Sequence, residues 1–219
     1  GLIRKYGPAS SESVLDCSCG IGTQAIGLAF QGFDVWGSDI SPESVRQAQK
    51  NAPAFDAAID FQVADMRFLT QSYDRTFDCI LSCGNSLAHF LDDEDIANVL
   101  GNVKKLLNPG GIFLAALTDH EGKTREERVF YDPHVKEHED GRTINFQLWK
   151  WIEHGSIYVC DDYTINDQGK PEISKVSAPF RIWRKDRLFK EASRHGYKKC
   201  HWILPEESGH HNPVFCAVT

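Results

Sequence analysis

This 219-residue sequence lacks two features that would point to particular classes of protein. No apolar run approaches the roughly 20 residues that a membrane-spanning helix needs, which argues against a membrane protein. Basic residues are not in excess either, since 24 lysines and arginines face 31 aspartates and glutamates and the net charge is −7. Nucleic-acid ligands usually require a basic surface, so we expect a partner of another kind.

Paired cysteines are missing as well. Cys17 and Cys19 are two residues apart and Cys79 and Cys83 are four apart, and neither is the C-x-x-C spacing of a zinc site. Seven scattered cysteines do not form a disulfide framework, and nine histidines show no repeated ligand spacing. We therefore expect reduced, buried thiols in a cytoplasmic protein without a metal site. Because the chain starts at Gly1 without Met, we also expect a preceding segment.

Strands and helices alternate regularly through residue 117. Predicted strands occupy 14–17, 33–38, 59–63, 77–82 and 112–117, and the main predicted helices occupy 23–31, a stretch opened by Ser41-Pro42-Glu43, and 93–107. This alternation is typical of an α/β fold, in which a mostly parallel, doubly wound sheet carries helices on both faces.

The pattern changes after residue 118. The stretch 119–141 is polar, and alternating runs then predict strands at 143–151, 156–165 and 173–182, which together form an antiparallel β insertion. A helix at 186–195 and strands at 197–204 and 214–218 follow. We accordingly divide the chain into a cofactor-binding α/β core, an insertion on the acceptor side, and a return to the core sheet, with the bounds 1–118, 119–182 and 183–219.

The densest motif lies between the first predicted strand and the first long helix. Asp16 ends the strand, and Gly20 and Gly22 form a Gly-x-Gly turn into the helix. Glycine lets the backbone turn tightly and approach a ligand without a Cβ in the way. Open α/β sheets bind ligands at the carboxyl ends of their strands, so this turn predicts a cofactor site.

Two further acids end the next two predicted strands. Asp39, followed by Ile40, lies 17 residues after Gly22, where a carboxylate can accept hydrogen bonds from ribose hydroxyls. Asp65 is followed by Met66, and this pair could hold an adenine ring. Each aspartate alone could be a helix N-cap or a turn residue. Three acids at the ends of three successive strands favour an adenosine site.

Two adenosine-containing cofactors are compatible with these motifs. The segment Gly20 to Ala25 fits the G-x-G-x-x-A pattern of NAD(P)-binding oxidoreductases, and Asp39 supplies the acid of that pattern. Such an enzyme has no need of Asp16, however, and the chain ends in a helix and two strands rather than in a second three-strand half. S-adenosyl-L-methionine is therefore favoured, with NAD(P) as the alternative.

The order of these motifs resembles that of the class I S-adenosylmethionine-dependent methyltransferases. The motifs are Asp16-x-x-x-Gly20-x-Gly22, Asp39, Asp65-Met66 and Asn108-Pro109-Gly110-Gly111. The segment from Gly84 to Phe90 is similar to the G-N-S-x-A-H segment of the glycine and sarcosine N-methyltransferase group. The resemblance implies a Rossmann-like, seven-stranded, mostly parallel sheet with a reversed last strand, and transfer of a methyl group to a small molecule.

The resemblance also implies roles for individual residues. Ser18 and Gly20 would line the methionine part of the cofactor, Asp39 would hold the ribose, Asp65 the adenine, and the backbone of Cys83 would touch the cofactor. The full set of cofactor residues is Asp16, Ser18, Gly20, Gly22, Asp39, Ile40, Asp65, Met66 and Cys83.

One departure from the family concerns the methyl acceptor. In the glycine enzymes an arginine within a D-H-R-N segment binds the carboxylate of the substrate, whereas Glu121 occupies that position here. An acid repels a carboxylate and attracts a cation. We therefore expect N-methylation of a small amine other than glycine, unless Arg125 or Arg128 replaces the missing arginine.

The resemblance implies that Asn85 faces the methyl acceptor, and other residues are placed on the acceptor side because they lie near the ends of strands. The predicted acceptor residues are Asn85, Ser86, His89, Glu121 and His210. His89 and Glu121 are candidate bases, but transfer from a sulfonium mainly needs alignment and exclusion of water, so no catalytic residue is assigned. The Pro-Pro and Pro-Cys motifs of DNA methyltransferases are missing after Ser82. The alternative function is that of a module that binds the cofactor without catalysis. The sequence is also compatible with an oligomer.

Overall fold

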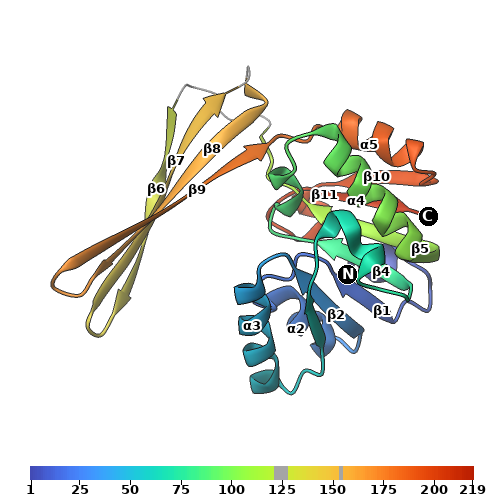
Figure 1. Ribbon diagram of the computed structural model, residues 1–219, viewed down its shortest axis with the longest axis horizontal. Coiled ribbons are helices and arrows are strands. Elements are labelled where there is room, and N and C mark those ends of the chain that lie inside the picture. The colour runs from blue at the N-terminus through green and yellow to red at the C-terminus, as the bar shows by residue number, and fades with distance from the viewer. Residues whose placement is uncertain (121–127, 153–154) are drawn as a thin grey trace. The chain divides into compact units, whose positions relative to one another are not determined.

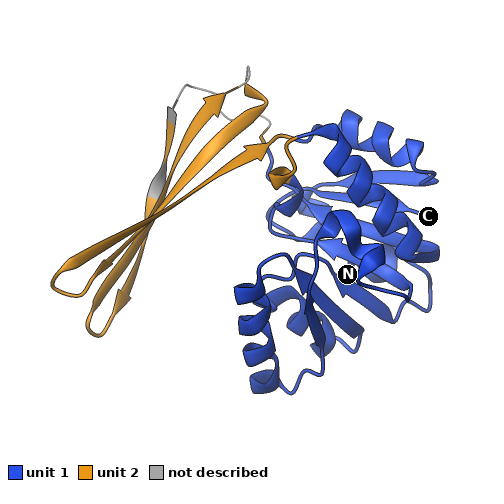
Figure 2. Cartoon of the chain, viewed as in Figure 1, with its two compact units in different colours: residues 1–87, 92–119, 183–219 blue, residues 88–91, 120–182 orange. Residues whose placement is uncertain are grey.

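The computed structural model of the protein describes residues 1–120, 128–152 and 155–219 (Figure 1). The chain divides into two compact units (Figure 2). Unit 1 comprises residues 1–87, 92–119 and 183–219, and unit 2 comprises residues 88–91 and 120–182. No helix within the described ranges is both long enough and apolar enough to cross a membrane.

Unit 1 is built on a seven-stranded sheet with the strand order β10-β11-β5-β4-β1-β2-β3. The strands are β1 (Ser13–Asp16), β2 (Asp34–Asp39), β3 (Asp60–Val63), β4 (Phe77–Ser82), β5 (Leu107–Ala116), β10 (Lys199–Ile203) and β11 (Val214–Val218). Neighbouring strands from β1 to β5 run parallel, whereas β11 is antiparallel to both β5 and β10. The predicted doubly wound sheet with a reversed last strand is therefore confirmed.

Helices cover both faces of this sheet (Figure 1). On one face, α1 (Leu2–Tyr6), α2 (Thr23–Phe30) and α3 (Pro42–Asn51) contribute Ile3, Ile26 and Val45 to the buried core. On the other, α4 (Asp93–Leu106) lies beside α5 (Lys185–Arg194), whose Phe189 ring is 6.0 Å from that of Phe215 in β11. A short helix, α6 (Pro205–Ser208), follows β10.

The helix α4 shows how the sequence specifies these elements. Its buried residues repeat at three- and four-residue intervals, namely Ile96, Val99, Leu100, Val103 and Leu106. Asp92 caps its first turn, because its carboxylate accepts a hydrogen bond from the Asp95 amide at 2.9 Å. The chain turns into β5 after Leu106, close to the predicted end of the helix.

Unit 2 contains a four-stranded antiparallel sheet in the order β6-β7-β8-β9. The strands are β6 (Arg128–His138), β7 (Gly141–Ile152), β8 (Ile157–Asp167) and β9 (Pro171–Arg181). The antiparallel insertion is present, but the three predicted strands were too few, because the polar stretch 119–141 includes β6. That strand lies at a sheet edge, where its residues are largely exposed and need no apolar alternation.

Three short helices were also not predicted. These are α1, α6 and the 3₁₀ helix η2 (Met66–Gln71). Helices of four to six residues carry too few periodic positions to be recognised from an apolar pattern. Two further 3₁₀ turns, η1 (Ala52–Phe55) and η3 (Ser86–His89), complete the elements.

Candidate functional site

The glycine turn after β1 leaves free space beside its backbone. Gly20 and Gly22 both have positive φ angles, +52° and +90°. A Cβ at Gly22 would lie 3.2 Å from Ala48 and Phe61, so this glycine is needed for packing. A Cβ at Gly20 would meet no atom within 4 Å. Gly20 therefore borders open space, into which a ligand can approach the backbone.

Asp39 at the end of β2 joins this turn directly. Its carboxylate accepts hydrogen bonds from the backbone amides of Gly20 and Ser41, each at 2.9 Å. The Cys19 amide also donates to the Ser38 carbonyl oxygen at 2.9 Å, which ties the turn to β2. The structure thus brings together two of the predicted cofactor residues, and the carboxylate is fixed at the carboxyl edge of the sheet.

Asp16 is buried at the end of β1, with 1% of its surface exposed. Burial, with a smaller contribution from the nearby Asp39 charge, raises the pKa of its carboxyl to about 7, although a hydrogen bond from the Ser18 amide acts in the opposite direction. A cationic ligand group beside these two acids would favour the ionised carboxylate, since opposite charges stabilise each other in a poorly solvated site.

Ser18 connects the glycine turn to the end of β4. Its hydroxyl is 3.0 Å from the Ser82 hydroxyl and also bonds the Cys83 carbonyl oxygen at 3.4 Å. Ser86 donates to that same carbonyl at 3.0 Å. Burial raises the pKa of the Cys83 thiol to about 12, so this sulfur stays protonated and is not a nucleophile. The three predicted residues Ser18, Cys83 and Ser86 therefore form one network.

Asp65 has a partner that sequence reasoning missed. Its carboxylate accepts hydrogen bonds from the Arg67 side chain, the shortest at 2.6 Å, and caps η2 by accepting from the Arg67 amide at 2.9 Å. These bonds lower the pKa of Asp65. Arg67 also bonds Asp95 at 3.0 Å, at the start of α4. The Asp-x-Arg spacing is the sequence signal from which this ion pair could have been predicted. The ion pair keeps the Asp65 carboxylate charged and fixes its position.

The two large apolar residues among the predicted cofactor residues differ in exposure. Met66 is buried, with 6% of its surface exposed, while Ile40, just after β2, is 65% exposed. The Met66 side chain thus contributes to the core, whereas Ile40 lies open to solvent at this edge of the sheet. The Ala64 amide donates to the Asp39 carbonyl oxygen at 3.1 Å, so β2 and β3 end at the same level.

The predicted acceptor residues fall in both units. Asn85, in unit 1, has a φ of +63° and accepts a hydrogen bond from the Thr118 amide at 3.0 Å, which links the ends of β4 and β5. His89 belongs to unit 2, where its ring centroid lies 4.3 Å from that of Phe180 and partial burial lowers its pKa. Glu121 lies outside the described residues, as does Arg125.

Trp149 and Trp151 lie in the buried aromatic core of unit 2. Their rings pack with Tyr158 and with His120, whose ring centroid is 5.7 Å from that of Trp149. All four side chains are less than 9% exposed. We therefore assign these aromatic residues to packing, which orders the strand ends of unit 2 next to Ile182.

A cavity of about 330 Å³ in unit 1 contains two further predicted residues. Cys83 and His210 both line it, together with apolar side chains from α1, α2 and the sheet, including Leu28 and Leu114. His210 is held in place because its Nδ1 accepts a hydrogen bond from the Asn212 amide at 3.0 Å. The loop after β10 therefore reaches the carboxyl end of β4.

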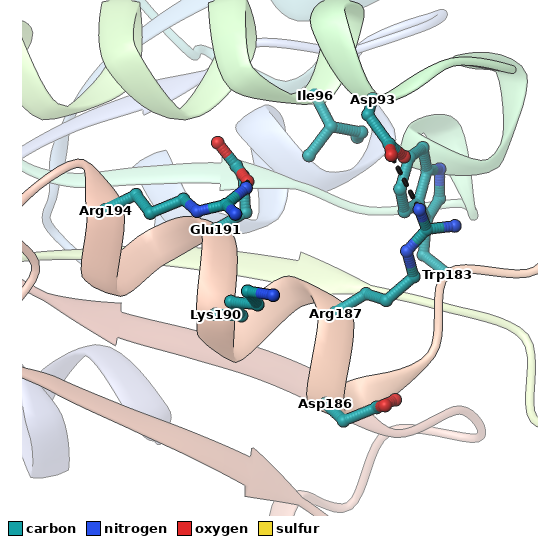
Figure 3. Close-up of a pocket in the computed structure, with 8 residues that line it drawn as sticks. All are labelled: Asp93, Ile96, Trp183, Asp186, Arg187, Lys190, Glu191 and Arg194. Carbon is teal, nitrogen blue, oxygen red and sulfur yellow. Dashed lines mark hydrogen bonds and ion pairs between the residues drawn. The ribbon is translucent and has the colours of Figure 1, made fainter.

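A second hollow of about 290 Å³ lies between α4 and α5 (Figure 3). Its charges are largely paired, since Arg187 bonds Asp93 at 2.6 Å and Arg194 bonds Glu191 at 2.8 Å. None of the predicted cofactor or acceptor residues lines it. It is therefore a polar groove between helices, separate from the glycine turn.

The described residues contain no cluster of three or more histidine, cysteine, aspartate or glutamate side chains that could hold a metal ion. All seven cysteines are free, and five of them are buried. The cysteine pattern therefore agrees with the expectation of unpaired thiols.

Comparisons with known proteins find methyltransferases with similar sequences. Residues 14–111 match a family described as a methyltransferase domain. The chain is 32% identical over 124 residues to a glycine/sarcosine N-methyltransferase of Parasynechococcus marenigrum, covering 57% of this chain and 42% of that protein. It is 30% identical over 128 residues to the glycine N-methyltransferase of Rattus norvegicus, covering 52% and 42%. The matched part thus spans less than half of these relatives.

Solved structures of other proteins superpose on nearly the whole chain. CalS10, an amino pentose methyltransferase from Micromonospora echinaspora, superposes with a TM-score of 0.82 at 13% identity, covering 99% of this chain and 86% of that one. DesVI of Streptomyces venezuelae gives 0.80 at 17% identity, covering 99% and 87%. The fold is therefore that of the Rossmann-like methyltransferases. Together with the domain match over residues 14–111, this confirms the resemblance to the class I S-adenosylmethionine-dependent methyltransferases and the similarity in sequence to the glycine/sarcosine N-methyltransferase group.

Proposed function

We propose that this protein binds S-adenosyl-L-methionine at the carboxyl edge of β1, β2 and β4 and transfers its methyl group to the nitrogen of a small amine. The observation that carries the proposal is the joined pair of Gly20 and Asp39, whose backbone amide and carboxylate are bonded beside open space. A ribose can bond a carboxylate held in this way. The domain match over residues 14–111 supports the same assignment.

The residues at this edge suit a positively charged cofactor. Asp16 and Asp39 place two acids within reach of each other, and the pKa of Asp16 is about 7 because the carboxyl is buried. The methionine part carries an ammonium and a sulfonium, so it would stabilise both carboxylates. Ser18 and the Cys83 carbonyl oxygen supply further polar atoms on the β4 side.

The proposed reaction needs little chemistry from the protein. S-adenosyl-L-methionine would supply the methyl group: the acceptor nitrogen would bond the methyl carbon while sulfur keeps the electron pair of the broken carbon–sulfur bond. This would leave S-adenosylhomocysteine, and the amine would release its proton to solvent. The main task of the protein is then to align the two groups and exclude water.

An amine acceptor is proposed on two grounds. Several relatives and structural neighbours are named as N-methyltransferases of glycine, sarcosine or sugars. Glu121 stands where the carboxylate-binding arginine of the glycine enzymes would be, so we propose a neutral or cationic amine, such as an amino sugar, over glycine.

Calorimetry with S-adenosylmethionine and with NAD tests the cofactor assignment. We expect binding of S-adenosylmethionine only, weakened about 10- to 100-fold by Asp39→Asn, because a hydrogen bond to a charged group contributes about 1.5–3 kcal/mol. The matched control is Asp34→Asn, at the exposed opposite end of β2, which should bind normally. Binding of NAD with no binding of S-adenosylmethionine would refute the proposal.

The acceptor is tested by measuring S-adenosylhomocysteine release over a panel of amino sugars, simple amines, glycine and sarcosine. We expect turnover of at least one amine without a carboxylate, and a rate for glycine at least tenfold lower. Robust glycine turnover would contradict the role given to Glu121. Cofactor binding without turnover of any acceptor would favour the alternative of a binding module without catalysis.

A further inference from the structure

Arg67 uses every nitrogen of its guanidinium group to join two acids. Its Nε atom bonds both oxygens of the Asp65 carboxylate at 3.1 Å, and its Nη2 atom bonds one of them at 2.6 Å. Its Nη1 atom bonds Asp95, near the start of α4, at 3.0 Å. A planar guanidinium fork fixes the plane of a carboxylate, which the point charge of a lysine does not. The orientation of the Asp65 carboxylate is therefore set by Arg67.

The carboxylate of Asp65 has little capacity for further hydrogen bonds. An ionised carboxylate offers about four lone-pair positions. Its Oδ1 atom accepts from the amide and the Nε atom of Arg67, and its Oδ2 atom accepts from Nη2, while the single Nε hydrogen is shared between the two oxygens. About one position, on Oδ2, is therefore left for a ligand, and the Asp65 side chain is 21% exposed.

Further hydrogen bonds fasten the segment that follows Asp65 to α4. The side-chain nitrogen of Asn102 donates to the Arg67 carbonyl oxygen at 2.7 Å. The side-chain oxygen of Asn102 accepts from the amide and the hydroxyl of Thr70, at 3.2 and 2.7 Å. With the bond between Arg67 and Asp95, these contacts hold η2 near both of its ends. The Asp65 carboxylate therefore cannot turn without breaking contacts that tie η2 to another helix.

The fixed orientation of this carboxylate determines which purine can bind beside it. An amino group at position 6 of a purine donates a hydrogen bond, whereas an oxo group at that position accepts one. A 6-oxo purine instead carries a donor hydrogen on the neighbouring N1 atom. A carboxylate oxygen only accepts. If the Asp65 carboxylate faces position 6, it therefore bonds adenine and repels a 6-oxo base, whereas a carboxylate that could turn would reach the N1 hydrogen of the 6-oxo base.

We propose that Arg67 is a positioning residue that makes the cofactor site selective for adenine, because it holds Asp65 in an orientation that accepts from a 6-amino group and not from N1. The guanidinium nitrogens are already engaged with the two acids, so Arg67 acts through Asp65. This inference rests on the proposed function, since it requires the adenosyl group of S-adenosyl-L-methionine to lie beside Asp65 at the carboxyl edge of the sheet.

A purely structural role of Arg67 predicts a different result. The bond to Asp95 and the contacts of Asn102 join η2 to α4 whether or not a ligand is bound. Loss of this connection alone would weaken the binding of every purine by the same factor. Loss of the fixed carboxylate orientation would change the preference between an amino and an oxo purine. The ratio of the two dissociation constants therefore separates the positioning role from the structural one.

Calorimetry with S-adenosylhomocysteine and with S-inosylhomocysteine, its 6-oxo analogue, measures this ratio without turnover. The native chain should bind the adenosyl compound about 10- to 100-fold more tightly, which is the range of one hydrogen bond to a charged group. Arg67→Met should reduce this preference to about threefold or less, because Asp65 is then able to turn. The matched control is Arg46→Met, which removes an exposed ion pair with Glu43 on α3 and should keep the native ratio within about twofold.

Circular dichroism verifies that each variant is folded. If Arg67→Met does not fold, Arg67→Lys replaces it and should also lower the preference, because lysine keeps the charge but cannot bond both oxygens as a fork. A folded variant at position 67 that keeps the native ratio would overturn the inference, as would equal binding of the two compounds by the native chain. If the native chain binds neither compound, the proposed cofactor site itself is refuted, and this inference fails with it.

Discussion

Asp16, Asp39 and Asp65 are the same side chain in three different environments. Asp16 is buried with a raised pKa, Asp39 accepts bonds from two backbone amides, and Asp65 is paired with Arg67. The sequence predicts an acid at the end of each strand, but it does not show how each is solvated. Burial and partners come from residues distant in sequence, such as Asp95, which bonds Arg67.

The buried carboxyl of Asp16 predicts a pH-dependent stability. Its pKa of about 7 in the folded chain exceeds the usual value of 3.8, so the folded state holds a proton that the unfolded state loses. This contribution to the free energy of unfolding is fully present below about pH 4 and declines as the pH rises to about 7. At about 1.36 kcal/mol per pKa unit, the loss is on the order of 4 kcal/mol.

Urea unfolding of the native chain and of Asp16→Asn between pH 5 and pH 8 measures this effect. Asparagine retains an oxygen that can accept the bond from the Ser18 amide, but it does not titrate. We expect the free energy of unfolding of the native chain to fall, relative to that of Asp16→Asn, as the pH rises. Parallel pH profiles would show that Asp16 has an ordinary pKa.

At the scale of elements, predictability follows the strength of the local pattern. The strands β4 and β11 have the predicted bounds, because each is a short apolar run buried on both faces. The strand β6 was missed because Pro133 and several charged residues interrupt it, and its pairing with β7 comes from the tertiary fold. Local sequence gives no sign of a strand whose stability comes from its neighbour.

Two glycines of α2, one at its N-cap and one inside the helix, should respond oppositely to substitution by alanine. Gly22 has a φ of +90°, and a Cβ there would lie 3.2 Å from Ala48 and Phe61, so Gly22→Ala should lower the free energy of unfolding by about 1–3 kcal/mol. Gly27, inside the helix, has no atom within 4 Å of its missing Cβ, and Gly27→Ala should raise stability by about 0.5–1 kcal/mol.

Denaturant unfolding of both variants shows whether the effect at Gly22 comes from its positive φ angle or from replacing any glycine by alanine. Equal changes in the two variants, in either direction, would contradict the assignment of Gly22 as a conformational requirement of the turn.

At the scale of the whole molecule, the alternation of strands and helices was enough to predict the class of fold. The seven-stranded sheet with its reversed last strand came from the family resemblance and is confirmed, whereas the strand order was not predicted. The cofactor residues at the glycine turn are predicted from the same motifs, whereas the bond between Arg67 and Asp95 is not. It joins η2 to α4, and a local sequence pattern does not show which residues of these two elements meet.

The position of β11 between β5 and β10 has a consequence for the order in which the protein is made. Residue 214 leaves the ribosome 98 residues after residue 116, roughly 5 to 20 seconds later at 5–20 residues per second. Until then one edge of the apolar strand β5 has no hydrogen-bonding neighbour. The hairpins of unit 2 are synthesised within this interval, so this interval is when the nascent chain is most exposed to aggregation and in greatest need of chaperones.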